Sequence, residues 1–260
     1  MSGPGDAGVV YEYTVPGGQY LFSVTPATVP SAPITAFGYE PDSGLLFYGF
    51  YETSFGQCQM YPIETSTPNW ATNSSATFQG ADALISGLAA ADGNQSLYMS
   101  QFGGELWQCP SPQSLNGFCG LLAGNGGVQF AALASAELRG TFVPFLAAES
   151  ASGSSTYKID CYNTAAGLIP VSSQTFNSIA TNGMTTGPAD GGFTLFVSDG
   201  TQVWAAPACC GTDCATFTAV SGLDGVAPGA LAVDPQGQTL YVADSNAQQM
   251  VAVPLAAATP

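Results

Sequence analysis

The sequence predicts an all-β fold, a β-propeller of five four-stranded repeats, because one short pattern recurs along the chain. In each repeat an apolar strand follows a glycine-containing turn and ends at or near a polar or acidic residue. The five strands are Leu45–Phe50, Ser96–Ser100, Thr141–Ala147, Thr194–Asp199 and Thr239–Asp244. Equivalent positions in successive repeats are 51, 45, 53 and 45 residues apart. A period of roughly 40–50 residues with four short strands is typical of propeller blades.

The last repeat shows the expected order of strands within a blade. Ala230–Val233 is the inner strand, Leu240–Ala243 is the second and Met250–Val253 is the third. Ala215–Val220 is the outer strand of the preceding blade. Glycine and proline occupy nearly every junction between strands, and their totals of 32 and 18 favour many tight turns over helices.

The N-terminal segment is expected to complete the ring of a single propeller domain, residues 1–260. The last repeat stops after its third strand, and Gln19–Val24 precedes the first inner strand, where a fourth strand belongs. We therefore expect Gln19–Val24 to close the ring by pairing with the last blade. Val9–Val15, within residues 1–17, is then an outer fifth strand, part of a rudimentary sixth blade, or a strand exchanged with another molecule. An apolar strand of this kind needs cover, because an open edge promotes aggregation.

The charge composition excludes some classes of partner. Only 8% of the residues are charged, and the net charge of −16 comes from 18 carboxylates set against Arg139 and Lys158. Nucleic-acid binding needs clustered basic residues, so it is excluded, and anionic membranes are disfavoured for the same reason. No apolar run is long enough to span a bilayer, so we expect no membrane insertion.

Seven cysteines indicate an oxidising compartment. Cys109 and Cys119 flank a loop with proline and glycine, as the two sides of a hairpin would, and are expected to pair. Cys209, Cys210 and Cys214 crowd one turn, so one of the first two is expected to pair with Cys214.

Cys58 and Cys161 are left without an assigned partner, and the odd count leaves at least one cysteine outside intramolecular pairs. Asn73 and Asn94 begin N-glycosylation sequons, which also favours an extracellular or cell-surface protein. Residues 1–6 do not have the pattern of a signal peptide, so either the chain is a processed form or the compartment is a different one.

One repeat resembles a known family. The segment Val233–Asn246 (VDPQGQTLYVADSN), followed by Met250–Val253, is similar to the NHL repeat and to related six-bladed propellers. It departs from the family where Gln248 and Gln249 replace the usual basic residue. Cysteines on third strands, Cys109 and Cys161, are similar to those of secreted propellers. The resemblance implies the fold but no ligand, because such repeats serve enzymes, receptors and scaffolds alike.

Candidate site residues lie at the ends of the second strands. The four acids are Glu52, Glu149, Asp199 and Asp244. The loops after second strands share one face of a propeller, so these acids are expected to ring the mouth of the central channel. Such a ring is suited to hold Ca²⁺ or to supply the acid and base of a glycosidase. The simpler interpretation is that each acid accepts backbone N–H bonds in its own turn.

The chain has no histidine, which removes Ser-His-Asp and Cys-His catalysis and histidine metal sites. We therefore expect an extracellular structural or binding module without a required cofactor. It would be a subunit of a cell-surface or filamentous assembly formed by strand addition, with partners that are further copies, other extracellular proteins or glycans. The alternative is a carboxylate-based propeller glycosidase or a calcium-dependent lactonase-like hydrolase.

Overall fold

The computed structural model describes residues 10–13, 20–24, 35–40, 45–52, 57–64, 71–72, 76–78, 85–91, 96–110, 119–124, 127–180, 183–189, 191–234 and 236–255. These residues form 22 strands. Within the same ranges, no helix is long and apolar enough to cross a bilayer.

Each repeat forms one antiparallel sheet whose strands follow chain order, except in the first sheet, where the last two strands both pair with the third. The first sheet contains β3 (Ala36–Glu40), β4 (Leu45–Glu52), β5 (Gln57–Glu64), β6 (Ala71–Thr72) and β7 (Ala76–Phe78). The second contains β8 (Ile85–Ala91), β9 (Ser96–Gln101), β10 (Glu105–Pro110) and β11 (Gly120–Gly124). The third contains β12 (Phe130–Leu138), β13 (Thr141–Glu149), β14 (Tyr157–Asn163) and β15 (Gly167–Pro170).

The fourth sheet contains β16 (Met184–Ala189), β17 (Gly192–Ser198), β18 (Val203–Pro207) and β19 (Thr218–Ala219). The last sheet has three described strands, β20 (Pro228–Val233), β21 (Thr239–Asp244) and β22 (Gln249–Pro254). The five strands predicted from the repeat are therefore β4, β9, β13, β17 and β21, the second strand of each sheet. The predicted propeller is confirmed.

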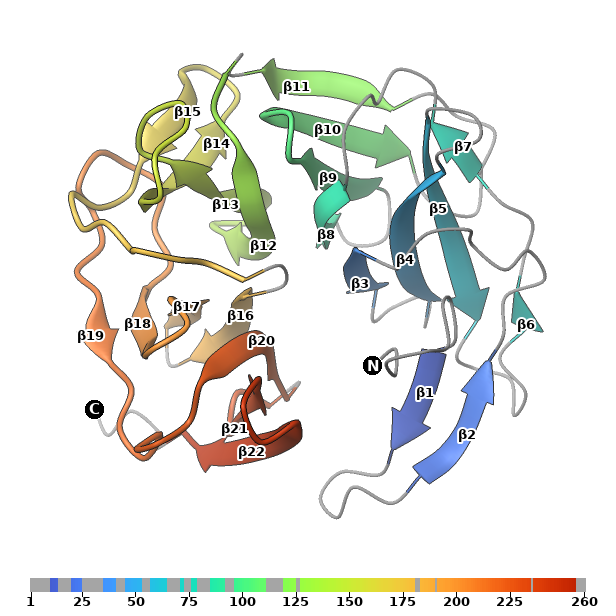
Figure 1. The fold of residues 1–260 in the computed structure, drawn as a ribbon. Helices are drawn as coiled ribbons and strands as arrows, with labels where there is room; N and C mark the ends of the chain where they lie inside the picture. The colour runs from blue at the N-terminus through green and yellow to red at the C-terminus, as the bar shows by residue number, and fades with distance from the viewer. Residues whose placement is uncertain are drawn as a thin grey trace.

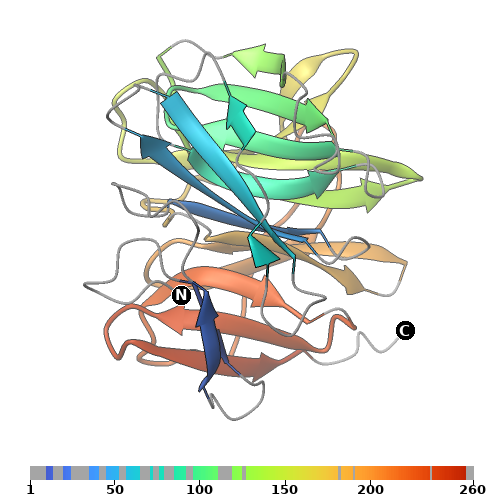
Figure 2. The ribbon, with the colours of Figure 1, turned by 90° about the vertical axis from the view of Figure 1, so that its right-hand side faces the viewer.

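The sheets are arranged around a centre, with the first strand of each sheet innermost (Figure 1). The inner strands pack in sequence, β3 against β8, β8 against β12, β12 against β16, and β16 against β20. Figure 2 shows the same ring from the side, with the last blade in its lower part. This arrangement places the turns after the second strands on one face.

The N-terminal strands depart from the expected ring closure. β2 (Tyr20–Val24) pairs with β1 (Val10–Tyr13) in an antiparallel hairpin, and not with the last blade. The hairpin lies between the last and first blades (Figure 1), which makes it a rudimentary sixth blade. A short connection explains the pairing, because closing six residues costs less chain entropy than joining the two ends of the ring.

Apolar side chains between neighbouring blades form the core. Phe145, Cys161 and Leu195 belong to one cluster between the third and fourth blades. There Phe176 meets Phe217 edge-on, with ring centroids 5.4 Å apart, and Trp204, with centroids 6.3 Å apart. The aromatic residues thus contribute to the packing that holds successive blades together.

Glycines on inner strands let neighbouring blades approach closely. A Cβ added to Gly38 would lie 2.8 Å from the Leu88 Cβ, and one added to Gly87 would lie 2.4 Å from the Leu133 Cβ. On the other side of the ring, a Cβ on Gly187 would lie 2.4 Å from a methyl group of Val233. Each contact joins one inner strand to the next, so side-chain size at these positions sets the spacing of the blades.

Replacing Gly87 by alanine is expected to lower the free energy of unfolding by about 1–3 kcal/mol. The added Cβ would also lie 2.7 Å from the Leu133 backbone nitrogen, so the inner strands would have to move apart. Chemical denaturation measures the loss. The matched control is Gly120→Ala, because a Cβ there meets no atom within 4 Å. Equal stability of the two variants would show that the close approach is not limiting.

Candidate functional site

Glu149 fastens a loop to the start of an inner strand. It is the last residue of β13 and is only 5% exposed. Its Oε2 accepts hydrogen bonds from the Gln129 N–H and the Gly153 N–H, both at 3.2 Å. Gln129 directly precedes β12, whereas Gly153 lies in the loop after β13. The carboxylate therefore joins the inner strand to the loop of its own blade.

Asp244 has the same role in the last blade. Its Oδ1 accepts N–H bonds from Asn246 at 3.0 Å, Ala247 at 3.2 Å and Ala227 at 3.3 Å. Ala227 directly precedes β20. The hydrogen bond from Ala247 has the largest effect on the pKa of Asp244 and lowers it. The bonds from Asn246 and Ala227 lower it further, so the pKa lies below its usual value although burial raises it. This carboxylate remains charged at neutral pH as an acceptor for its turn.

Asp199 directly follows β17 and uses both carboxylate oxygens. Oδ1 accepts the Thr201 hydroxyl at 2.8 Å, the Thr201 N–H at 3.0 Å and the Gln202 N–H at 2.8 Å. Oδ2 accepts the Trp204 indole N–H at 2.7 Å. Burial raises the pKa of Asp199, but the bonds from Trp204, Thr201 and Gln202 outweigh it and lower the pKa overall.

Replacing Asp199 by asparagine is expected to cost about 1–2 kcal/mol of stability at pH 7, because an NH₂ group would replace one of the accepting oxygens. Since the folded-state pKa is lowered, the wild-type advantage is fully present above the ordinary value of 3.8 and disappears as pH falls through the folded-state pKa. Thermal unfolding at pH 7 and at about pH 3 measures this convergence. Asp224→Asn is the control, because Asp224 is exposed. A difference that is constant with pH would contradict the assignment.

The remaining acid of the predicted ring is Glu52, the last residue of β4, whose side chain lies outside the described part. The predicted glycosylation residues, Asn73 and Asn94, also lie outside the described residues. Among the residues that are described, no three His, Cys, Asp or Glu side chains are grouped so that they could hold a metal ion. The acids at the loops of the third, fourth and last blades bind their own backbone, an arrangement that does not fit a shared calcium site.

Three disulfides connect six of the seven cysteines. Cys109 pairs with Cys119 across the β10–β11 hairpin, as predicted. Cys209 pairs with Cys214 within one loop, which settles the choice that the sequence left open. Cys58 has no cysteine of this chain left with which to pair.

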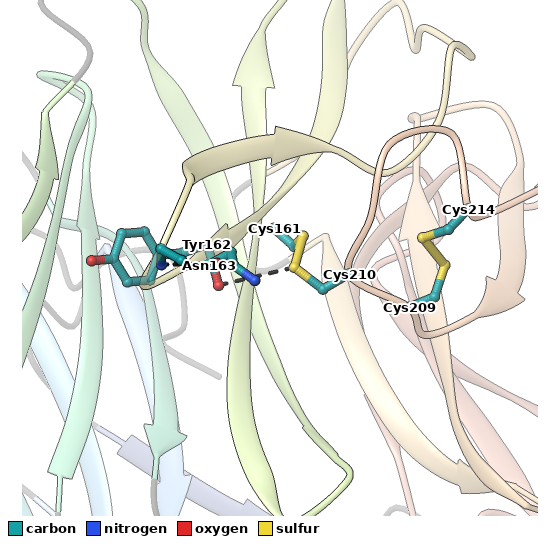
Figure 3. Close-up of a disulfide and its surroundings, with 7 residues drawn as sticks. Cys161, Tyr162, Asn163, Cys209, Cys210 and Cys214 are labelled. Carbon is teal, nitrogen blue, oxygen red and sulfur yellow. Dashed lines mark hydrogen bonds between the residues drawn. A yellow bond between two sulfur atoms is a disulfide. The ribbon is translucent and has the colours of Figure 1, made fainter.

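The third bond, Cys161 to Cys210, corrects the prediction that left Cys161 without a partner. It links β14 of the third blade to the loop after β18 of the fourth (Figure 3). The Cys210 Sγ also lies 4.0 Å from the Tyr162 carbonyl oxygen. The sequence could not indicate this pair, because the two cysteines are 49 residues apart and meet only when adjacent blades pack.

An ion pair between a half-buried lysine and a buried aspartate was also missed. The Lys158 Nζ lies 3.5 Å from the Asp160 Oδ2, and the two side chains are 32% and 3% exposed. The Asp160 Oδ1 is buried and accepts no hydrogen bond from the described residues. Burial raises the pKa of Asp160, and the nearby Lys158 ammonium offsets only part of that rise. Asp160 pairs with Leu146 of β13, so it faces the apolar contact between the second and third blades.

Comparison with known proteins gives a structural match without a sequence family. No family model and no curated protein matches the sequence. A chain of the nidogen/laminin complex matches 96% of this chain and 88% of its own length, with a TM-score of 0.68 and 11% identity. The WD40 repeats of RRP9 match 92% of this chain and 82% of their own, with a TM-score of 0.59 and 13% identity.

The chain is a β-propeller. The periplasmic gluconolactonase of Pseudomonas aeruginosa also matches this propeller, over 94% of this chain and 72% of its own, with a TM-score of 0.57 and 16% identity. Identities this low show the fold alone. The chemistry of this propeller therefore has to be argued from its own residues.

Proposed function

We propose that this propeller is an extracellular binding and structural module that joins other polypeptides by strand addition. The observation that carries the proposal is the hydrogen bonding of three carboxylates, those of Glu149, Asp199 and Asp244. Each has at least one oxygen engaged by N–H groups of its own blade. A glycosidase needs one carboxylic acid and one free carboxylate facing the same substrate, and these acids are instead parts of three separate turns.

The three disulfides support an extracellular location, because such bonds persist in oxidising compartments. The solved structures similar to this propeller include a nidogen/laminin complex and a mitotic checkpoint complex. Propellers of this shape therefore occur as parts of protein assemblies, which is compatible with a protein-binding role here.

Val9–Val15 is the proposed donor strand within such an assembly. Its described part, β1, pairs with β2 on one edge, and no described strand covers its other edge. Strand addition would supply that cover through backbone hydrogen bonds. Deleting residues 1–16 is expected to reduce the native assembly with other polypeptides to smaller particles, measured by light scattering after size-exclusion chromatography. An unchanged particle size would remove strand donation from the proposal.

Calcium is expected to have no effect on this propeller. Adding calcium or EDTA should leave the melting temperature unchanged, because the acids at the loop face already bind backbone N–H groups. Assays with lactones and glycosides, with and without calcium, test the hydrolase alternative on the same sample. Calcium-dependent turnover that is lost on Asp199→Asn would overturn the binding-module proposal.

A further inference from the structure

We propose that the outer edge of β22 is the acceptor site for a partner, and that its occupant is an extended, cationic segment of another protein. This inference rests on the proposed function and deepens it by naming the site and the chemistry of the partner. The added segment would form the fourth strand of the last blade.

The position of β22 in its sheet differs from that of its counterparts. The third strand is covered by a fourth in the second, third and fourth blades, where β11 pairs with β10, β15 with β14, and β19 with β18. In the last blade the described sheet ends at β22. β22 also lies on the outside of the ring (Figure 1), where a partner chain has access.

The direction of the free backbone groups follows from the register. The Leu255 N–H donates to the Gln238 carbonyl, and Thr239 pairs with Pro254. The direction of the backbone N–H and C=O groups alternates along a strand. Those of Val253 and Val251 therefore point toward β21, and those of Met250 and Ala252 point outward. Pro254 also occupies an outward position, where its missing N–H costs no bond to β21.

Apart from Pro254 at its C-terminal end, the edge lacks the features that usually prevent pairing. Natural edge strands are protected by charged residues, proline or bulges. β22 has no charged residue, and its register with β21 is regular from Gln249 to Pro254. The Met250 side chain is 48% exposed, and Ala252 is also exposed. The edge therefore offers backbone donors and acceptors beside a small apolar surface.

Charge determines the kind of segment that fits. Residues 221–255 contain Asp224, Asp234 and Asp244 and no lysine or arginine. Asp234 accepts the Gln238 N–H in the turn beside the C-terminal end of β22. Burial raises the pKa of Asp234, but hydrogen bonds from Gln238 and Thr239 outweigh it, so the carboxylate is ionised at neutral pH. A cationic strand is attracted to this blade, whereas a second copy with a net charge of −16 is repelled.

The test uses the full chain and two synthetic peptides, one of alternating valine and lysine and one of alternating valine and glutamate. The lysine peptide is expected to bind at least tenfold more tightly, with an affinity that falls as salt rises. Ala252→Pro removes an outward N–H and is expected to weaken this binding at least tenfold. Ala252→Thr changes the side chain but keeps the N–H, so it should bind like the wild type.

A second readout keeps the proposal testable if Ala252→Pro is unstable. Hydrogen exchange of the wild-type chain should show protection of the Met250 and Ala252 amides on addition of the lysine peptide. The proposed site would be overturned if the peptide bound wild type and a folded Ala252→Pro equally well and left the Met250 and Ala252 amides unprotected. The peptide would then bind the acidic surface in general. If the chain dimerised without peptide and Ala252→Pro abolished the dimer, the occupant of the edge would be a second copy and not a cationic segment. If the native particle is a complex but the lysine peptide does not bind, the β22 inference fails while the proposed function stands.

Discussion

Replacing both Cys161 and Cys210 by alanine is expected to lower the free energy of unfolding by about 4 kcal/mol, as chain entropy predicts for a loop of this length. The bond closes 49 residues and joins two blades that also meet through side-chain packing and through backbone hydrogen bonds from Asp213 to Pro170 and from Ala215 to Val171. Cys161 is fully buried, so truncation also removes contacts in the core between these blades. Urea unfolding of the non-reduced proteins measures the difference.

The other two disulfides provide matched controls for this prediction. The bond from Cys109 to Cys119 spans 10 residues and that from Cys209 to Cys214 spans 5. Their removal is expected to cost about 3 and about 2 kcal/mol respectively. If loss of the inter-blade bond cost no more than loss of the Cys209–Cys214 bond, the third and fourth blades would not depend on a covalent link.

Replacing Lys158 by methionine is expected to cost about 3 kcal/mol at pH 7, because it leaves the Asp160 carboxylate buried without its cation. The pKa of Asp160 is already raised in the folded state, so the charged form is disfavoured there. Stability that depends on this group falls as pH rises from its ordinary value of 3.8 through the raised folded-state value. The cost of the substitution should therefore shrink when unfolding is measured below that ordinary value, where Asp160 is protonated in both states.

The double variant Lys158→Met with Asp160→Leu separates the two contributions. Removing both charges from the apolar contact between blades is expected to recover most of the stability lost in the single variant. A double variant as unstable as Lys158→Met alone would show that the loss comes from packing of the lysine stem and not from the unpaired carboxylate.

Much of the fold could be predicted because the repeat is local. Strands β4, β9, β13, β17 and β21 follow glycine-containing turns within a few residues, and such turns set the register of the hairpins. The ring closure could not be predicted in the same way. The short connection between β1 and Tyr20–Val24 favours a local hairpin, whereas the missing outer strand of the last repeat favours pairing with the last blade. The packing of distant parts of the chain decides between the two, and the repeat pattern does not show that packing.

The sequence predicted where the acids of the candidate site lie, but not which groups their carboxylates bind. Glu149, Asp199 and Asp244 do lie at the ends of second strands. Whether such an acid faces a ligand or its own turn depends on where N–H groups such as those of Gly153 and Gln202 lie, and loop geometry decides this. The Lys158–Asp160 pair has a readable signal, because two charges at alternate positions in an otherwise apolar strand share one face.

The pairing of Cys161 with Cys210 illustrates what sequence spacing omits. Vicinal cysteines at 209 and 210 point in different directions, so they serve different partners (Figure 3). The close approaches at Gly38, Gly87 and Gly187 are likewise contacts between blades. A repeat shows what one blade contains, whereas these features arise where two blades meet.

The mass of the native particle, isolated without reducing agent, tests the central claim most directly. Native mass spectrometry should find an assembly with partner chains, in which each propeller chain keeps its three disulfides. A particle that is a monomer without partner chains and with reduced cysteines would contradict both the extracellular location and the role as a binding module.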